Sequence, residues 1–295
     1  MQPEEIECLK KAGIIAKQAI AYARELIKPG MPLLEIAEKI ESKIEELGGK
    51  LAFPLNLSID EVAAHSTPAW NETKTARGLL KVDIGVHIEG YVADTAFSLD
   101  LENSEENKKL IEAAEKALEK ALEKIDLEVN LREIGKIIEK TISIRGFQAI
   151  RNLSGHSIER YNIHSGITIP NYDNSKDLEL KPGLYAIEPF ATSGLGSVKD
   201  GKPSEIYAVQ KSGNVREEFS REVLKFILKE YKTLPFCSRW IHKKFGSRGL
   251  LALKRIEEAG ILHNYPQLIE IGAGKVAQAE HTVLLIIKEK CITTL

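Results

Sequence analysis

The stretch from Lys81 to Ala96, KVDIGVHIEGYVADTA, constrains the fold more than any other part of this 295-residue chain. Apolar runs rich in β-branched and aromatic residues lie on either side of Glu89-Gly90. This pattern predicts a β-hairpin whose strands are Leu79–Ile88 and Tyr91–Leu99. A two-residue loop also fixes the register, because every pair of opposed residues then follows from the turn.

Two aspartates lie within this apolar hairpin. In the predicted register Asp83 faces Ala96 and Asp94 faces Gly85, so the aspartates are diagonal neighbours on one face, roughly 7–8 Å apart at the backbone. Two buried anions this close are costly unless a proton or a metal ion neutralises them. The alternative is a slipped register that leaves one aspartate at the strand edge in water.

Composition narrows the class of protein. Hydrophobic residues make up 43% of the chain and charged residues 28%, enough for a substantial core under a polar surface. The net charge of −2 gives no general affinity for nucleic acid, and we expect no specific DNA partner. Three scattered cysteines without a CxxC motif, the lack of a signal sequence and the lack of a long apolar run predict a cytoplasmic protein with no membrane anchor.

Helices and strands recur in the same order in the two halves of the chain. Helical periodicity predicts helices over 4–27, 33–47, 103–125 and 131–144, the third capped by Asn103 and Glu106. Strand-like sequence follows each pair, and Asn56-Leu57-Ser58 of the first half matches Asn152-Leu153-Ser154 of the second. A helix–helix–strand unit that occurs twice predicts an α+β fold, with pseudo-twofold halves around an antiparallel sheet and a site between the halves.

Five further residues, each of a type that carries chemistry, come from separate segments. His156 and His164 belong to NLSGHSIERYNIH, and His65 lies among small residues in EVAAHSTPA. Glu188 and Glu280 each lie in an apolar, strand-like run, in LYAIEPFAT and AQAEHTVLLII. Taken singly, a buried glutamate usually forms an ion pair and a lone histidine is usually structural.

Together with the aspartate pair, these residues form a metal-binding set of four carboxylates and one imidazole: Asp83, Asp94, His156, Glu188 and Glu280. Oxygen ligands with a single histidine suit Mn, Fe, Co or Zn better than a closed structural zinc site. Four carboxylates can neutralise two divalent ions, with two of them bridging metals ~3.5–4 Å apart. We therefore expect two divalent metal ions per chain.

Five ordered motifs, DIGVHIEG, ADTA, SGHSIERYNIH, AIEPFAT and AQAEHT, resemble the methionine aminopeptidase family, which has the pita-bread fold. The resemblance covers essentially the whole chain and implies a single catalytic domain over 1–295. It implies that Asp83 and Asp94 chelate the metals, with Asp94 bridging. It also implies that His156 and Glu188 each serve one metal and that Glu280 bridges both.

The resemblance also implies which residues meet the substrate. His65 and His164 match two histidines that contact substrate without binding metal, and Glu188 is expected to move a proton, so these three form the catalytic set. The pocket for the methionine side chain is implied to consist of Phe53, Ile163, Phe190, Tyr265 and Leu268. Ala279 departs from the family, where a larger aromatic residue is usual before the final glutamate. We expect this change to relax the size limit on the second substrate residue.

Ninety-one residues separate Glu188 from Glu280, and so long an insertion resembles the type 2 enzymes, in their archaeal form. The insertion, approximately 205–265, is predicted to be a helical subdomain with helices over 216–231, 239–245 and 249–259. Between 211 and 255 it carries twelve Lys and Arg but four Glu. A solvated subdomain explains this charge, and an RNA-facing patch that contacts the ribosome is the alternative.

The predicted reaction removes the initiator methionine from the N-termini of nascent polypeptides when the second residue is small, and the enzyme is expected to be a monomer. Two other functions remain open. A prolidase-like X-Pro peptidase shares the catalytic half of the fold but carries a preceding domain, whereas the first helix here starts near residue 4. A non-catalytic ribosome- or RNA-binding relative would keep the insertion and lose metal ligands.

Overall fold

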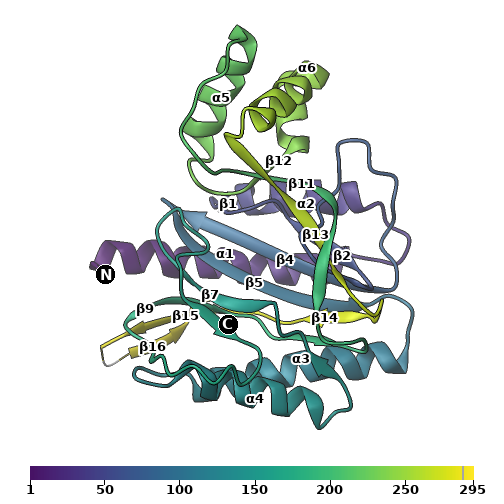
Figure 1. The fold of residues 1–295 in the computed structure, drawn as a ribbon, viewed down its shortest axis with the longest axis vertical. Helices are drawn as coiled ribbons and strands as arrows, with labels where there is room; N and C mark the ends of the chain where they lie inside the picture. Colours follow the sequence, from purple (N-terminus) through teal and green to yellow (C-terminus); the bar gives the residue numbers. More distant parts are fainter. Residues whose placement is uncertain (288) are drawn as a thin grey trace.

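The structure is a computed structural model that describes residues 1–287 and 289–295 (Figure 1). The helices are α1 (Pro3–Leu26), α2 (Leu33–Glu46), α3 (Glu105–Lys124), α4 (Leu131–Ser143), α5 (Glu218–Glu230) and α6 (Ser238–Glu258). The strands of the first half are β1 (Lys50–Leu51), β2 (Asn56–Ile59), β3 (Val62–Ala64), β4 (Leu79–Ile88) and β5 (Tyr91–Asp100). Those that follow α4 are β6 (Gln148–Ala149), β7 (Ser154–Ile158), β8 (Thr168–Pro170), β9 (Gly183–Ile187), β10 (Phe190–Thr192), β11 (Val198–Val209), β12 (Phe236–Cys237), β13 (Leu262–Glu270), β14 (Val276–Gln278), β15 (His281–Ile286) and β16 (Glu289–Ile292).

The β4–β5 hairpin has the predicted register. Asp83 pairs with Ala96 and Gly85 pairs with Asp94, so the two aspartates share one face. Glu89 and Gly90 both adopt positive φ, as a type I′ turn requires. Helices α1 and α2 pack an apolar layer of Ala and Ile side chains against the other face of the hairpin.

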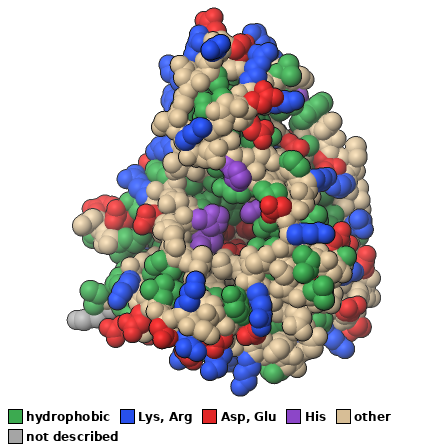
Figure 2. All heavy atoms as spheres, in the orientation of Figure 1, with side chains coloured by type: hydrophobic (Ala, Val, Ile, Leu, Met, Phe, Trp, Pro, Cys, Tyr) green, Lys and Arg blue, Asp and Glu red, His purple; other side chains and the backbone are tan. Residues whose placement is uncertain are grey.

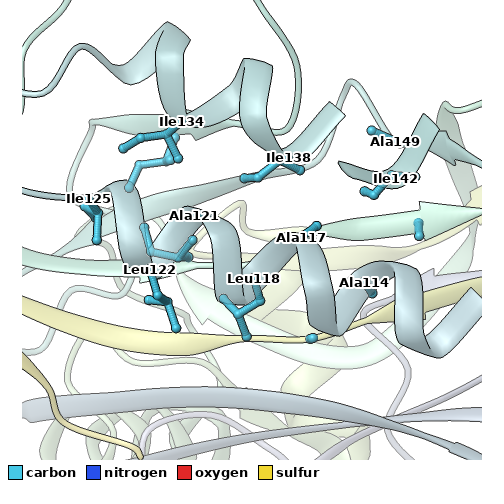
Figure 3. Close-up of a cluster of buried hydrophobic side chains, with 14 of the residues drawn as sticks. Ala114, Ala117, Leu118, Ala121, Leu122, Ile125, Ile134, Ile138, Ile142 and Ala149 are labelled. Atoms are coloured by element: carbon cyan, nitrogen blue, oxygen red, sulfur yellow. The ribbon is translucent and has the colours of Figure 1, made fainter. Parts of the chain in front are cut away.

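The second half repeats this arrangement with α3 and α4. Leu118 and Leu122 of α3 and Ile134 and Ile138 of α4 point into one buried layer (Figure 3). The layer continues onto Ile187, at the end of β9, and onto the strands β14 and β15. Each half therefore places two helices on the outer face of its strands, which leaves the inner faces of the strands to form the centre of the molecule.

Within the described residues the strands form four separate antiparallel sheets, where we expected one antiparallel sheet. Two strands are interrupted near the centre, β9–β10 at Glu188-Pro189 and β14–β15 at Ala279-Glu280. Pro189 has no N–H for a ladder, and an isolated bridge between Ala96 and Glu280 joins the two halves at the second interruption. The breaks therefore occur at two of the residues predicted to bind metal.

The helix bounds match the predicted ones to within a few residues, but the predicted cap of α3 is wrong. Ser104, not Asn103, is the N-cap, and its hydroxyl accepts a hydrogen bond from the Asn107 N–H at 3.3 Å. Asn103 instead has φ +56, and the Asp100 carboxylate accepts from the Ser104 N–H at 2.7 Å. The turn from β5 thus delays the helix start by one residue.

Helices α5 and α6 stand apart from the rest, at the top of Figure 1, around their own apolar cluster. The break predicted between 245 and 249 is present, because Gly246 has φ +64 inside α6. Arg239 does not belong to the surface charge counted above, since it is buried against Glu41 of α2. None of the helices within the described ranges is both long enough and apolar enough to cross a membrane.

Candidate metal and substrate site

The five predicted metal ligands come together at the centre of the molecule. Asp83 lies on β4, Asp94 on β5 and His156 on β7, whereas Glu188 and Glu280 lie at the two strand interruptions. The ladder β7–β9 places His156 opposite Ala186, two residues before Glu188. The bridge between Ala96 and Glu280 brings Glu280 beside Asp94. Each ligand position thus follows from strand pairing.

The distances are those of a metal-binding group. Ligand atoms of Asp94, His156 and Glu280 all lie within 4.8 Å of one another. His156 Nε2 is 3.8 Å from Asp94 Oδ2 and 3.6 Å from Glu188 Oε1. Within the described part of the chain, Asp83 Oδ1 and Asp94 Oδ1 are buried without any hydrogen-bond partner. These orphaned oxygens and the mixed carboxylate–imidazole donor set fit a bound divalent cation.

Burial is the main reason why these acids resist ionisation. It raises the pKa of Asp83 to about 7, against a smaller opposing effect of the Gln278 amide. Burial, followed by the charges of the neighbouring carboxylates, also raises the pKa of Asp94, Glu188 and Glu280 well above the ordinary range. Burial, helped by His164, lowers the pKa of His156 to about 3, so this imidazole is neutral and free to bind a metal.

Histidine side chains gather around a hollow near the middle of the face in Figure 2, with acidic side chains deep inside it. The hollow is a cavity of about 380 Å³. All the residues predicted for the site line it: Phe53, His65, Asp83, Asp94, His156, Ile163, His164, Glu188, Phe190, Tyr265, Leu268 and Glu280. Among the described residues, no Lys or Arg lines the cavity. A cation from outside the chain is therefore needed to balance ionised acids.

Two predicted substrate histidines lie at this cavity. The carbonyl oxygen of Pro266 lies 3.2 Å from His65 Nδ1 and can only accept, so Nδ1 carries the proton and Nε2 is an acceptor. Burial lowers the pKa of His65 to about 4 and also lowers the pKa of His164. The ring of His164 meets that of His156 edge-on at 4.3 Å. Both histidines are thus neutral at physiological pH.

Sequence reasoning missed several residues that line the cavity, among them Asn56, Asn152, Ile206, Pro235 and Gln278. Gln278 was the easiest of these residues to predict, because it precedes Glu280 by two positions in the motif AQAE. Its Nε2 lies 3.5 Å from Glu280 Oε2. Asn56 and Asn152 are the first residues of the two matching N-L-S segments, which was a usable signal. Pro235 lies far from the motifs in the sequence, and no local pattern indicates it.

The expectation for Ala279 is not supported by its position. Ala279 does not line the site cavity; it lines a second cavity, of about 540 Å³. Alternate residues of 278–281 line different cavities: Gln278 and Glu280 line the site, whereas Ala279 and His281 line the second cavity. The small side chain of Ala279 therefore adds no space to the cavity of the site.

Comparison with known proteins shows what this chain is similar to. The model of metallopeptidase family M24 matches residues 7–285. The methionine aminopeptidase of Pyrococcus horikoshii is 46% identical to this chain over 295 residues, which cover 98% of this chain and 99% of the relative. A structure of a thermophilic Arx1 has a TM-score of 0.86 at 15% identity and covers 99% of this chain and 91% of that one. A methionine aminopeptidase from Thermotoga maritima has a TM-score of 0.71 at 22% identity, with 100% and 98% covered.

The chain belongs to metallopeptidase family M24, and its α+β fold is that of the family's pita-bread structures. The two solved structures are too distant in sequence to show more than the fold. The identity to the archaeal relatives carries the assignment further. Within the family the chain belongs to the methionine aminopeptidases of archaeal type.

Proposed function

We propose that this chain hydrolyses the peptide bond after the initiator methionine of newly made proteins, provided that the second residue is small. The observation that carries the proposal is the cavity itself, in which a buried acidic group and two neutral histidines face an apolar pocket. Family membership supports the same chemistry. The alternative of an X-Pro peptidase has no specific observation in its favour.

The proposed cofactor is a pair of divalent metal ions, of Co, Mn, Fe or Zn. Asp83, Asp94, His156, Glu188 and Glu280 would hold them. Such ions acidify a bound water and polarise a carbonyl oxygen. The orphaned oxygens of Asp83 and Asp94 support this ligand set.

The remaining polar residues have separate proposed tasks. Glu188 takes the proton of the attacking water and delivers it to the departing amine. His65 presents an unprotonated Nε2, which suits it to accept a hydrogen bond from a substrate N–H rather than to stabilise an oxyanion. His164 is left to donate to the scissile carbonyl oxygen in the tetrahedral state. The acidic group attracts the free amine, which restricts cleavage to the chain terminus.

The apolar wall is proposed to select methionine. Phe190 is fully buried, and Phe53, Ile163, Tyr265 and Leu268 complete the wall. An unbranched thioether fills such a slot, and its burial contributes about 2–3 kcal/mol. Norleucine has nearly the same shape and should be accepted, whereas a charged first residue is opposed by desolvation.

A tripeptide series with metal analysis tests this function. Met-Ala-Ser, Nle-Ala-Ser, Leu-Ala-Ser and Lys-Ala-Ser vary the first residue, and Met-Leu-Ser varies the second. We expect cleavage of the first two peptides and about two metal ions per active chain. Cleavage of the Leu or Lys peptide at the rate of the Met peptide would mean a general aminopeptidase. Cleavage of Ala-Pro in place of Met-Ala-Ser would mean an X-Pro peptidase.

The arrangement of the whole chain is part of the proposal. Residues 1–295 act as one catalytic domain, a monomer in the cytoplasm, with approximately 205–265 as a helical insertion subdomain. Lys225, Lys229, Lys243 and Lys244 are exposed on α5 and α6 and form what we term the basic face. Clustered positive charge attracts phosphate without regard to sequence, so the basic face is a candidate contact with ribosomal RNA.

A further inference from the structure

The segment that carries His65 has to be held in place by its surroundings. His65 has φ +57, in the left-handed region that side chains other than glycine adopt at a cost. Next to it, the Ser66 N–H donates to Asn56 Oδ1 at 3.1 Å, and the Ser66 carbonyl accepts from the Leu57 N–H at 2.6 Å. The first bond ties the segment 65–68 to Asn56, the end of the segment 53–56 that begins with the pocket residue Phe53. The second ties it to the next residue, Leu57.

A buried ion pair lies against both segments. Arg239 of α6 donates to the two carboxylate oxygens of Glu41 on α2, at 2.7 Å and 2.9 Å. Glu41 also accepts from the Leu55 N–H at 3.2 Å and from Trp240 Nε1 at 2.9 Å. The side chains of Glu41 and Arg239 are only 8% and 4% exposed, so these bonds are shielded from water.

Arg239 also donates hydrogen bonds to the segment 65–68. Its Nε donates to the Pro68 carbonyl at 3.1 Å, and its NH2 group donates to Thr67 Oγ1 at 3.3 Å. One ion pair therefore contacts the segment 53–56 through Glu41 and the segment 65–68 through Arg239. Neither residue lines the cavity of the site, so any effect on the reaction has to pass through the segments that they hold.

We propose that Glu41 and Arg239 are a positioning pair, which sets the separation of Phe53 and His65 and so shapes the mouth of the substrate pocket. The inference rests on the proposed function and deepens it. It gives the α5–α6 unit a task in the reaction, because the guanidinium that holds the histidine segment comes from α6. The wide fork of Arg239 suits this task, since one planar group bonds to the carboxylate and to the second segment together.

The decisive variant is the double substitution Glu41→Gln with Arg239→Met. Removing one partner alone would leave a buried unpaired charge, whereas replacing both with neutral side chains of similar size keeps the fold accessible. With Met-Ala-Ser and saturating Mn²⁺, we expect kcat/KM to fall about tenfold or more, because a small misplacement near the reacting groups is costly. The preference for Met over Leu at the first position should also fall, because Phe53 is no longer fixed.

Asn107→Ala is the matched control. Asn107 is also fully buried, and its amide donates to Asp100 at 2.9 Å and accepts from Lys275 at 3.2 Å. None of its hydrogen bonds among the described residues reaches either segment. We expect this control to lower Tm and to leave kcat, KM and the Met/Leu ratio of the folded enzyme unchanged. A double variant that lowers Tm and likewise keeps these three values would overturn the positioning role.

The route through His65 is tested by combining variants. If the pair acts by placing the imidazole, its loss should reduce kcat much less in a His65→Ala background than in wild type. Equal losses in both backgrounds would overturn that route. Should the double variant not fold, Arg239→Lys keeps the charge opposite Glu41 and removes the contacts to Thr67 and Pro68. Unchanged kinetics in Arg239→Lys would then overturn the proposal. Wild-type protein that cleaves no Met-initiated peptide would overturn the proposed function and this inference together.

Discussion

A buried acidic site should lower the stability of the metal-free protein and support the activity of the metal-bound protein. Asp83→Asn separates these two effects, because it should stabilise the metal-free protein and abolish the activity of the enzyme. Burial raises the pKa of Asp83 from 3.8 to about 7. In that interval the folded chain keeps a proton that the unfolded chain releases, so the stability contributed by Asp83 is full below 3.8 and is lost as the pH rises through about 7. The interval corresponds to roughly 4 kcal/mol, at 1.36 kcal/mol for each unit. Asparagine is neutral at every pH and avoids this loss.

The assay is thermal unfolding of wild type and Asp83→Asn after treatment with a chelator, between about pH 5 and about pH 8. The Tm of the variant should exceed that of wild type by an amount that grows with pH, at roughly 2–4 °C for each kcal/mol. Added Mn²⁺ should raise the Tm of wild type much more than that of the variant, and the variant should lose more than roughly nine-tenths of its activity. Equal pH dependence in the two proteins would refute the effect of burial. An equal Mn²⁺ effect would refute the assignment of Asp83 as a ligand.

Three further predictions concern single features. Because burial lowers the pKa of His65 to about 4, its imidazole should stay neutral, and the pH profile of kcat/KM should show no titration of His65 above about pH 5. His65→Ala should lower kcat by about 100-fold. Glu270 accepts hydrogen bonds from four backbone N–H groups, of Leu195, Gly196, Gly272 and Gly274. Glu270→Gln should therefore lower the free energy of unfolding in urea by at least about 2 kcal/mol, and an unchanged midpoint would contradict this. Substitution of all four lysines of the basic face by Glu should weaken salt-dependent co-sedimentation with ribosomes and leave Met-Ala-Ser hydrolysis unchanged. Equal co-sedimentation of variant and wild type across a salt series would mean that α5 and α6 form only a solvated subdomain.

The hairpin and the helices were predictable because local rules determine them. The Glu89-Gly90 turn fixes the register that puts Asp83 and Asp94 on one face, and apolar spacing gives the helices to within a few residues. The start of α3 was not predictable in this way. There the Asp100 carboxylate captures the Ser104 N–H and moves the cap, an effect of the preceding strand rather than of helix propensity.

The gathering of the site residues could be inferred from the motifs, but their surroundings could not. Ala279 lies in the break between β14 and β15 and lines the second cavity, while Gln278 and Glu280 on either side of it line the site. Pro235 reaches the cavity, and Arg239 reaches the buried face of α2, through pairings between residues far apart in the sequence. A count of charges along the chain therefore included Arg239 among the surface charges, although its side chain is buried.

The molecule buries charge in two opposite ways: the Glu41–Arg239 pair is balanced within the chain, whereas the carboxylates of the cavity are not. The difference follows the proposed role of each site. Glu41 meets Arg239 and two further N–H donors, so its charge is balanced within the chain and the result is a rigid contact. Asp83 and Asp94 lie among other acids. Among the residues that the structure describes, Lys81 is the one buried lysine, and its ammonium donates to the carbonyl of Asp60 at 2.7 Å. Leaving the acids unbalanced lowers the stability of the metal-free chain, and it makes the free energy of cation binding part of the stability of the active fold.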